Sequence, residues 1–194
     1  FQTVCAINFG AERRAEILSA FGRCIARYGV EGSTLDKVAA EAGLARALIR
    51  HNVGNRDELL EAFVAHYGDE TNKAFGALFD ALPESDPMPT LMDWLFDPDF
   101  SDPDEASVSN ALFTAAIEHP ALARELNAWT EGFTEQIASV LQRAYPNSTD
   151  RCQAAAVALV AIYFNFDTMA PLGDPKHWRQ ISLSAAELVL EALD

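Results

Sequence analysis

A cluster of basic side chains lies within a chain whose formal net charge is −15. Arg46, Arg50, His51 and Arg56 are close together, and no acidic residue falls between Glu41 and Asp57. Arginine carries planar, permanently charged donors that match phosphate oxygens and the O6 and N7 edge of guanine. The cluster is therefore either a solvated helix face or a site for a negatively charged partner.

The acidic residues are distributed unevenly along the chain. Residues 1–61 contain eight Lys or Arg and eight Asp or Glu, so the whole net charge of −15 comes from the remainder. An acidic surface repels nucleic acids and anionic membranes. We therefore expect any anion-binding role in the first third of the chain.

Catalytic, metal-binding and membrane signals are missing from the sequence. The four histidines are scattered, and no nucleophile motif, phosphate loop or metal-ligand spacing appears. The acidic stretch 97–105 lacks the Gly and the closing Glu of an EF-hand loop, which favours a solvated loop over a calcium site. We thus expect no enzyme, no catalytic residue, no metal and no cofactor.

Cysteine use and hydropathy point to the cytoplasm. The three cysteines form no Cys-x-x-Cys pair, which favours buried thiols in a reducing compartment. The most apolar window, Ala154–Phe166, is too short to cross a bilayer, and residues 1–10 lack the pattern of a signal peptide. We therefore expect a cytoplasmic protein without a membrane partner.

The spacing of the apolar residues predicts a chain made almost wholly of helices. Thr34 is placed to cap the second helix, Gly43 to end it, and Asn55 with Glu58 to form a capping box before the fourth helix. The expected helices cover about 11–28, 33–42, 45–52, 56–82, 90–96, 106–118, 121–144, 150–169 and 176–193.

The turn Ala42-Gly43-Leu44 joins two short helices into a helix-turn-helix. A small apolar core fixes one helix across the other and leaves one face of the second helix free for a DNA major groove. We expect that core to consist of Leu35, Val38, Ala39, Leu44, Leu48 and Ile49.

Seven residues are candidate contacts to double-stranded DNA. Arg46 and Arg50 are four apart and share one helix face, and Arg56 lies beside the N–H groups that open the fourth helix. Thr34 can offer a hydroxyl to the phosphate backbone. The predicted DNA-binding residues are Thr34, Lys37, Ala45, Arg46, Arg50, His51 and Arg56.

From about Glu12 to Phe63 the chain resembles the DNA-binding domain of the TetR family of transcriptional regulators. The resemblance is carried by Ser33-Thr34, Val38-Ala39, Glu41-Ala42-Gly43-Leu44, Leu48-Ile49 and Gly54-Asn55-Arg56-Asp57-Glu58-Leu59-Leu60. Beyond it, the chain resembles the family only in being helical, with a late Ala-rich helix and an amphipathic final helix.

Four positions depart from the family's usual pattern. Arg50 stands where tyrosine is usual, Val53 where phenylalanine is common, Ala45 where serine is common, and Arg56 where lysine is usual. The two arginines preserve or increase the positive charge at these positions, so we still expect DNA binding. Ala45 offers a base only a methyl contact.

The resemblance implies an all-α protein with two domains. We expect an N-terminal arm and a three-helix, helix-turn-helix DNA-binding domain over residues 1–56, and a helical ligand-binding and dimerisation domain over 57–194. The family forms homodimers through its last two helices, and the apolar segment Ala154–Phe166 and the apolar face of 181–190 agree with that. A dimer reads two half-sites of a palindromic operator.

An effector site is harder to place from the sequence. Aromatic side chains and one acid of the second part are candidates for contact with an unidentified small molecule, although core packing explains any single one of them equally. The predicted set is Trp94, Phe113, Trp129, Phe133, Tyr163 and Asp167, with Asn165 and Phe164 as further candidates.

Two interpretations of function remain. The first is a ligand-responsive regulator, a repressor by family default, in which the ligand shifts the fourth helix and the separation of the recognition helices. The alternative is the same fold acting as a protein-interaction module without sequence-specific DNA binding, which the acidity and the altered recognition helix favour.

Overall fold

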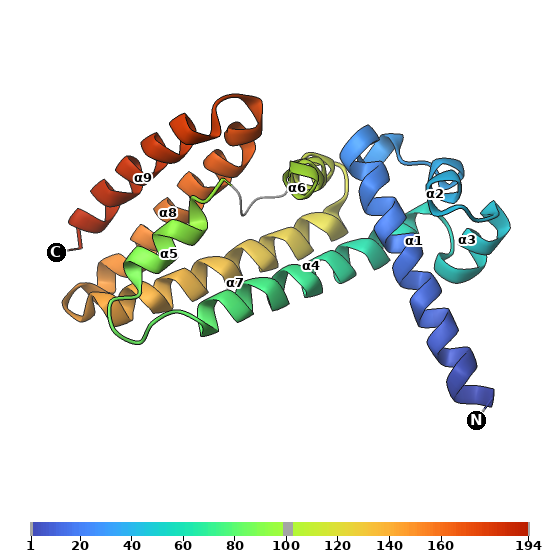
Figure 1. Ribbon diagram of the computed structural model, residues 1–194, viewed down its shortest axis with the longest axis horizontal. Coiled ribbons are helices and arrows are strands. Elements are labelled where there is room, and N and C mark those ends of the chain that lie inside the picture. The colour runs from blue at the N-terminus through green and yellow to red at the C-terminus, as the bar shows by residue number, and fades with distance from the viewer. Residues whose placement is uncertain (1, 99–102, 194) are drawn as a thin grey trace. The chain divides into compact units, whose positions relative to one another are not determined.

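The computed structural model describes the backbone of residues 2–98 and 103–193 and the side chains of 10–98 and 104–193. Every regular element in this part is helical (Figure 1), which confirms the predicted all-α class. Residues 99–102 of the acidic stretch and the side chain of Cys5 lie outside it. The α-helices are α1 (Gln2–Gly32), α2 (Leu35–Ala42), α3 (Arg46–Val53), α4 (Arg56–Asp80), α5 (Met88–Leu95), α6 (Pro103–Ala115), α7 (Pro120–Ala144), α8 (Thr149–Met169) and α9 (Pro175–Glu191). Two short 3-10 turns, Pro146–Ser148 and Ala170–Leu172, flank α8.

The first helix differs most from its prediction. It begins at Gln2 rather than near Ala11, because apolar spacing marks where a helix is packed and not where it starts. It also continues to Gly32 through a kink at Gly29, whose φ of 68° lies in the left-handed region that glycine tolerates.

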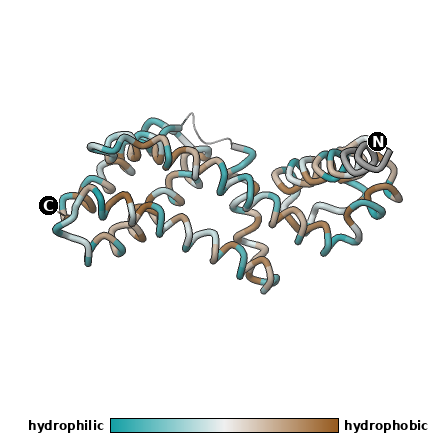
Figure 2. The backbone as a smooth tube through the Cα atoms, turned by 90° about the horizontal axis from the view of Figure 1, so that it is seen from below, coloured by the Kyte–Doolittle hydropathy of each residue, from teal (hydrophilic) through white to brown (hydrophobic). Residues whose placement is uncertain are grey.

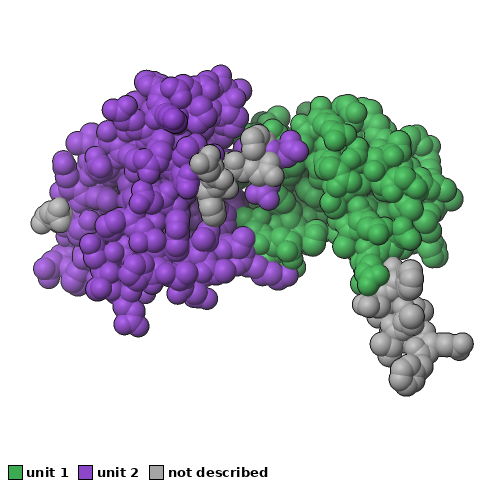
Figure 3. Space-filling view, viewed as in Figure 1, with its two compact units in different colours: residues 1–71, 107–126 green, residues 72–106, 127–194 purple. Residues whose placement is uncertain are grey.

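The described chain divides into two compact units, coloured separately in Figure 3. Unit 1 comprises residues 1–71 and 107–126, and unit 2 comprises 72–106 and 127–194. The helices α4 and α7 each contribute residues to both units. The functional boundary that we expect after residue 56 stays a prediction.

The core of unit 1 is built around α1. Ile17, Phe21 and Ile25 are at most 1% exposed, and Val38 of α2 and Ile49 of α3 are fully buried in the same cluster. An eight-residue helix such as α3 is too short to be stable alone. Packing of its apolar side into the unit 1 cluster therefore holds α3 in place.

One residue of the expected helix-turn-helix core lies elsewhere. Leu48 is 37% exposed, whereas Ile49 beside it is fully buried. Consecutive residues on a helix point about 100° apart, so only one of the two can face α1. The prediction for Leu48 was wrong, and the side chain belongs to the outward face of α3.

The core of unit 2 is formed by α5, α7, α8 and α9. Along the helices of both units, hydrophobic and hydrophilic segments alternate (Figure 2), as expected for helices that each bury one side. In α8, Ala156 and Leu159 are fully buried while Val157 is 55% exposed. The burial on several sides that we expected for α8 is therefore incomplete within one chain.

The helical segment Pro146–Leu172 is long and apolar enough to span a membrane by length and composition, and its most apolar 18-residue window has a mean hydropathy of 1.5. We expected no such segment, because we counted unbroken apolar runs and not a window average. A single segment of this kind carries little weight, since core helices of soluble proteins pass the same test.

Candidate nucleic-acid interface

Local capping sets the geometry of the helix-turn-helix. The Thr34 hydroxyl oxygen accepts a hydrogen bond from the Lys37 backbone N–H at 3.4 Å, so α2 begins where the sequence predicts. Gly43 ends α2 with a φ of 66°, in the left-handed region that glycine takes without a Cβ penalty. Before α4, the Asn55 N–H donates to Glu58 at 2.7 Å and Asn55 Oδ1 accepts from the Glu58 N–H at 3.0 Å. These caps confirm the predicted turn and capping box.

Arginines of α1 fasten the two short helices. Glu41 of α2 accepts hydrogen bonds from Arg23 at 2.6 Å and from Arg27 at 2.7 Å. Arg14 donates to the backbone carbonyl of Asn52, near the end of α3, at 3.0 Å. The second short helix, α3, is therefore held at its buried side by packing and near its last turn by a hydrogen bond. These two contacts fix the direction of its outward face.

Two basic side chains on that outward face are available to a partner. Arg50 and His51 are both exposed, and neither has a hydrogen bond or ion pair within the described part of the chain. Glu41, the nearest preceding acid, is occupied by Arg23 and Arg27. An exposed guanidinium without an internal partner is free to meet a phosphate or a guanine edge.

The other candidates on the helix-turn-helix are exposed but differently engaged. Arg46 Nη1 donates to Asp36 Oδ2 at 3.0 Å. Lys37 Nζ donates to the Gly32 carbonyl at 2.8 Å and lies 3.9 Å from the centre of the Tyr28 ring. Thr34 and Ala45 are exposed, and Ala45 precedes α3 without a side-chain cap.

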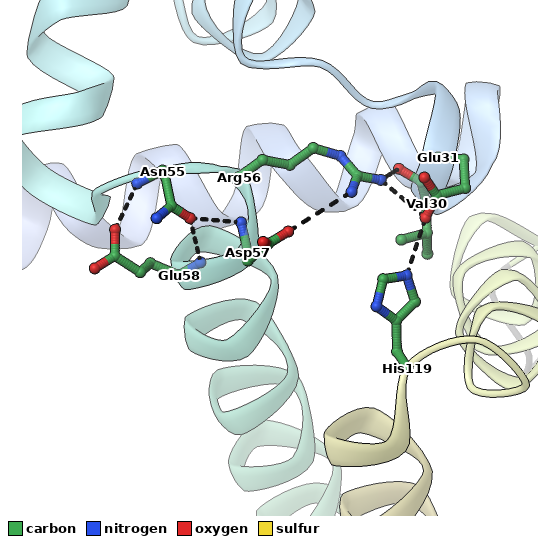
Figure 4. Close-up of polar contacts among 7 residues, drawn as sticks. All are labelled: Val30, Glu31, Asn55, Arg56, Asp57, Glu58 and His119. Atoms are coloured by element: carbon green, nitrogen blue, oxygen red, sulfur yellow. Dashed lines mark hydrogen bonds and ion pairs between the residues drawn. The ribbon is translucent and has the colours of Figure 1, made fainter.

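Arg56 occupies a different setting from Arg50. As Figure 4 shows, its guanidinium turns toward the end of α1, where it donates to the Val30 carbonyl at 2.8 Å and pairs with Glu31 at 3.1 Å. The Arg56 side chain is only 26% exposed, and its Nη1 lies 4.0 Å from Asp57 Oδ1. The arginine therefore joins α4 to α1, and its donors are largely committed within unit 1.

Glu31 and His119 belong to the same polar group, and sequence reasoning missed both. His119 Nε2 lies 3.0 Å from Glu31 Oε1, so the imidazole N–H and the Arg56 guanidinium share one carboxylate. The hydrogen bond from His119, and then that from Arg56, lowers the pKa of Glu31 below its ordinary value. No local sequence signal links these residues, because they come from three separate helical ends.

Four of the predicted effector contacts gather in unit 2. The rings of Trp129 and Phe133 are stacked with centres 6.1 Å apart, and Tyr163 lies 5.6 Å from Phe133. Trp94 lines the same cluster, together with Phe75 at 4.6 Å from Phe133. A cavity of about 10 Å³, room for about one water molecule, is lined by Phe75, Trp94, Phe133 and Tyr163 among others, and Trp129 is not part of its lining.

Phe164, a further candidate, belongs to this aromatic cluster, with its ring centre 5.9 Å from that of Trp129 and 5.6 Å from that of Tyr163. The other candidates are not among its rings. Phe113 is on α6 within unit 1 and is 36% exposed. Asp167 is half-buried near the end of α8, and Asn165 is exposed on the same helix. Four of the six predicted contacts therefore gather in unit 2, and the set of six stays a prediction.

Sequence comparison finds relatives that match about a quarter of the chain. No protein-family model matches it. The HTH-type transcriptional repressor AcnR of Corynebacterium jeikeium is 43% identical over 49 residues, which are 25% of this chain and 26% of that protein. The HTH-type transcriptional regulator BetI of Burkholderia thailandensis is 39% identical over 54 residues, 28% of each. The chain thus aligns with little more than a quarter of these relatives.

Solved structures match nearly the whole chain. A TetR transcription regulator from Haloarcula marismortui aligns with a TM-score of 0.78 at 18% identity, covering 94% of this chain and 98% of that one. A TetR-family transcriptional regulator from Streptomyces coelicolor aligns with a TM-score of 0.70 at 21% identity, covering 94% and 96%.

The architecture places the chain among the all-α proteins that have an N-terminal helix-turn-helix and a helical second part. Within this class the chain has the fold of the TetR-family transcriptional regulators, as the resemblance predicted.

Proposed function

We propose that this chain is a ligand-responsive, DNA-binding transcriptional regulator that acts as a homodimer in the cytoplasm. The observation that carries the proposal is the outward face of α3, which a hydrogen bond from Arg14 of α1 helps to hold in place. On this face Arg50 and His51 are exposed and have no hydrogen-bond or ion-pair partner among residues 10–98 and 104–193. The relatives that match about a quarter of the chain are named as HTH-type regulators, which supports the same conclusion.

Selection of bound duplexes from a random DNA pool tests the proposal. The full chain is incubated with the pool at low and at moderate salt, and bound DNA is sequenced. We expect enrichment of a palindrome, with an affinity that falls as salt rises because neutralised phosphates release counterions. If neither salt concentration enriches a sequence, the protein-interaction alternative replaces the proposal.

The proposed dimer face combines α8 and α9. Val157 of α8 is 55% exposed, and Ile181 and Leu188 of α9 are 40% and 67% exposed. These helices pack on each other in unit 2, so a second copy of the chain would cover their outer sides. Leu188→Glu is expected to yield monomers by analytical ultracentrifugation, and Glu187→Gln, an exposed neighbour, is the control.

A dimer also provides a use for the apolar α8 that needs no membrane. One-third of its most apolar window is buried within the chain, and the copy across the dimer would cover part of the remainder. We therefore assign this helix to the protein interior and the dimer interface. Recovery of the expressed full chain in the membrane fraction after washing with salt and carbonate would contradict the assignment.

The proposed effector site is the aromatic cluster of Trp94, Trp129, Phe133 and Tyr163. A ligand-sized pocket occupies about 300 Å³ or more, whereas about 10 Å³ is open here. Binding must therefore separate the rings, and a ligand that favours the opened arrangement would shift the population toward it. Because α4 contributes residues to both units, it is the element that we expect to transmit the change.

Tryptophan fluorescence tests the effector proposal. A library of aromatic and aliphatic compounds is screened for quenching, and hits are repeated with Trp129→Phe and with Trp178→Phe, whose ring lies elsewhere in unit 2. We expect the quenching to be reduced in Trp129→Phe, where Trp94 of the same cluster still reports, and to be kept in Trp178→Phe. Compounds that quench both variants equally and leave DNA binding unchanged would exclude the cluster as the effector site.

A further inference from the structure

Arg46 and Asp36 form an ion pair between the two helices of the helix-turn-helix. Arg46 is the first residue of α3 and Asp36 lies in the first turn of α2. Arg46 Nη1 donates to Asp36 Oδ2 at 3.0 Å, and the two side chains are 61% and 67% exposed. A pair this exposed contributes little to folding stability, so stability does not explain its presence on the surface that meets DNA in the proposed function.

The carboxylate is unfavourable for DNA binding taken alone. Asp36 adds negative charge at a surface that must approach phosphates, which lowers affinity for any duplex. Asp36 also stabilises α2 itself, since an acid in the first turn of a helix interacts favourably with the helix dipole. This effect does not involve DNA. The pairing with Arg46 is an additional feature that neither of these effects requires.

The geometry points to an orienting role. A free arginine side chain adopts many rotamers, and ordering it on a base costs conformational entropy. A carboxylate that holds one edge of the guanidinium pre-orients the planar fork and leaves other N–H donors open. Such an edge is complementary to the O6 and N7 acceptors of guanine in the major groove.

We propose that Asp36 is a positioning residue that holds Arg46 for recognition of a G·C base pair in each half-site. This inference rests on the proposed DNA-binding function and deepens it. Arg50 lies one turn further along the same face and has no such partner among the described residues. Arg46 therefore contributes discrimination between base pairs, whereas Arg50 contributes mainly affinity.

The test compares three kinds of duplex with five proteins, the wild type and four variants. The duplexes are the selected operator, operators in which each G·C pair is replaced in turn, and a random duplex. The proteins are the full-length wild type, Asp36→Asn, Arg46→Ala and Arg50→Ala, each checked for folding by circular dichroism. Asp36→Glu serves as the conservative variant that retains the carboxylate.

We expect Asp36→Asn to bind the random duplex a few-fold more tightly and to lose about tenfold of the preference for one G·C pair. Arg46→Ala should lose preference for the same pair, and Asp36→Glu should restore part of it. Arg50→Ala should weaken operator and random duplex by similar factors. A merely structural role for Asp36 would not raise random binding while lowering base discrimination.

Other results overturn the inference in distinguishable ways. If Asp36→Asn keeps the wild-type preference at every position, Asp36 acts only through its charge or the helix dipole. If Arg46→Ala and Asp36→Asn affect different base pairs, the two residues do not act as a unit. If the wild type prefers no sequence at all, the proposed DNA-binding function fails and this inference falls with it.

Discussion

The outward face of α3 and the first turn of α4 carry the same kind of side chain but use it differently. Arg50 is exposed and has no partner in the described part of the chain. Arg56 is 26% exposed and is bound to the Val30 carbonyl at 2.8 Å and to Glu31 at 3.1 Å. A basic residue therefore remains a candidate DNA contact only where the fold places no acid or carbonyl group beside it.

Because the contacts of Arg50 and Arg56 differ, we expect their removal to change different properties of the protein. Removal of Arg50 breaks no internal contact, so its effect should appear in binding and not in folding. Removal of Arg56 leaves the Val30 carbonyl without its guanidinium donor and Glu31 without one of two partners, so its effect should appear first in folding. Both expectations are open to measurement with single substitutions.

The largest effect is expected from Arg50→Ala. Operator affinity should fall by about fivefold or more, since a lost arginine contact to DNA costs about 1–3 kcal/mol. The free energy of unfolding should change by less than about 0.5 kcal/mol, as at other exposed sites. Fluorescence anisotropy with labelled operator measures the first quantity and urea unfolding the second.

Arg124→Ala is the matched control, because Arg124 is exposed on α7, away from the helix-turn-helix, and its removal changes the net charge equally. The slope of log affinity against log salt should decrease in magnitude by about one for Arg50→Ala if the contact is to a phosphate. Equal losses of affinity in the two variants would mean that α3 does not face the DNA.

A smaller effect, of opposite kind, is expected from Arg56→Ala. The free energy of unfolding should decrease by about 1–2 kcal/mol, because a charged donor to a partly buried carbonyl is lost. Operator affinity of the folded protein should remain within about threefold of wild type, less than the loss expected of a direct contact. Urea unfolding and anisotropy at a temperature where both proteins are folded provide the comparison.

Arg56→Lys sharpens this result. Lysine keeps the charge but lacks the planar fork that serves the Val30 carbonyl and Glu31 together, so most of the destabilisation should persist. Should Arg56→Ala instead leave stability unchanged and reduce affinity as strongly as Arg50→Ala, the arginine acts as a phosphate contact, like the lysine usual at this place in the family.

Local features of this fold were predictable from the sequence, and distant contacts were not. The caps at Thr34, Gly43 and Asn55 depend on neighbouring residues and on backbone geometry, so residue type and spacing predict them. The contacts of Arg14 with Asn52 and of Arg56 with Glu31 join separate helices. A single sequence carries no signal for such pairs.

The effector site shows the same limit. Aromatic residues could be named, and Trp129, Phe133 and Tyr163 do meet in unit 2. Phe113 falls in unit 1 because α6 contributes to that core, an arrangement that helix periodicity does not reveal. Apolar spacing shows which side of a helix is buried but not which helix covers it.

The smallest expected effect concerns acid and the carboxylate that Arg56 and His119 share. Hydrogen bonding lowers the pKa of Glu31 below its ordinary value of 4.5. A carboxyl group with a lowered folded-state pKa stabilises the fold at pH values above its ordinary pKa, and this contribution is lost as pH falls through the folded-state pKa. The stability conferred by Glu31 should therefore be complete above pH 4.5 and decline below it.

Glu31→Gln tests this pH dependence. Wild type and variant should differ by a few tenths of a kcal/mol above pH 4.5, since Glu31 is 65% exposed and solvent screens its interactions. The difference should shrink on further acidification, as followed by urea unfolding at a series of pH values. Glu12→Gln, an exposed glutamate without a partner in the described part of the chain, should show no such convergence. A Glu31→Gln difference that is constant across the range would assign the loss to packing and leave Arg56 held by the Val30 carbonyl alone.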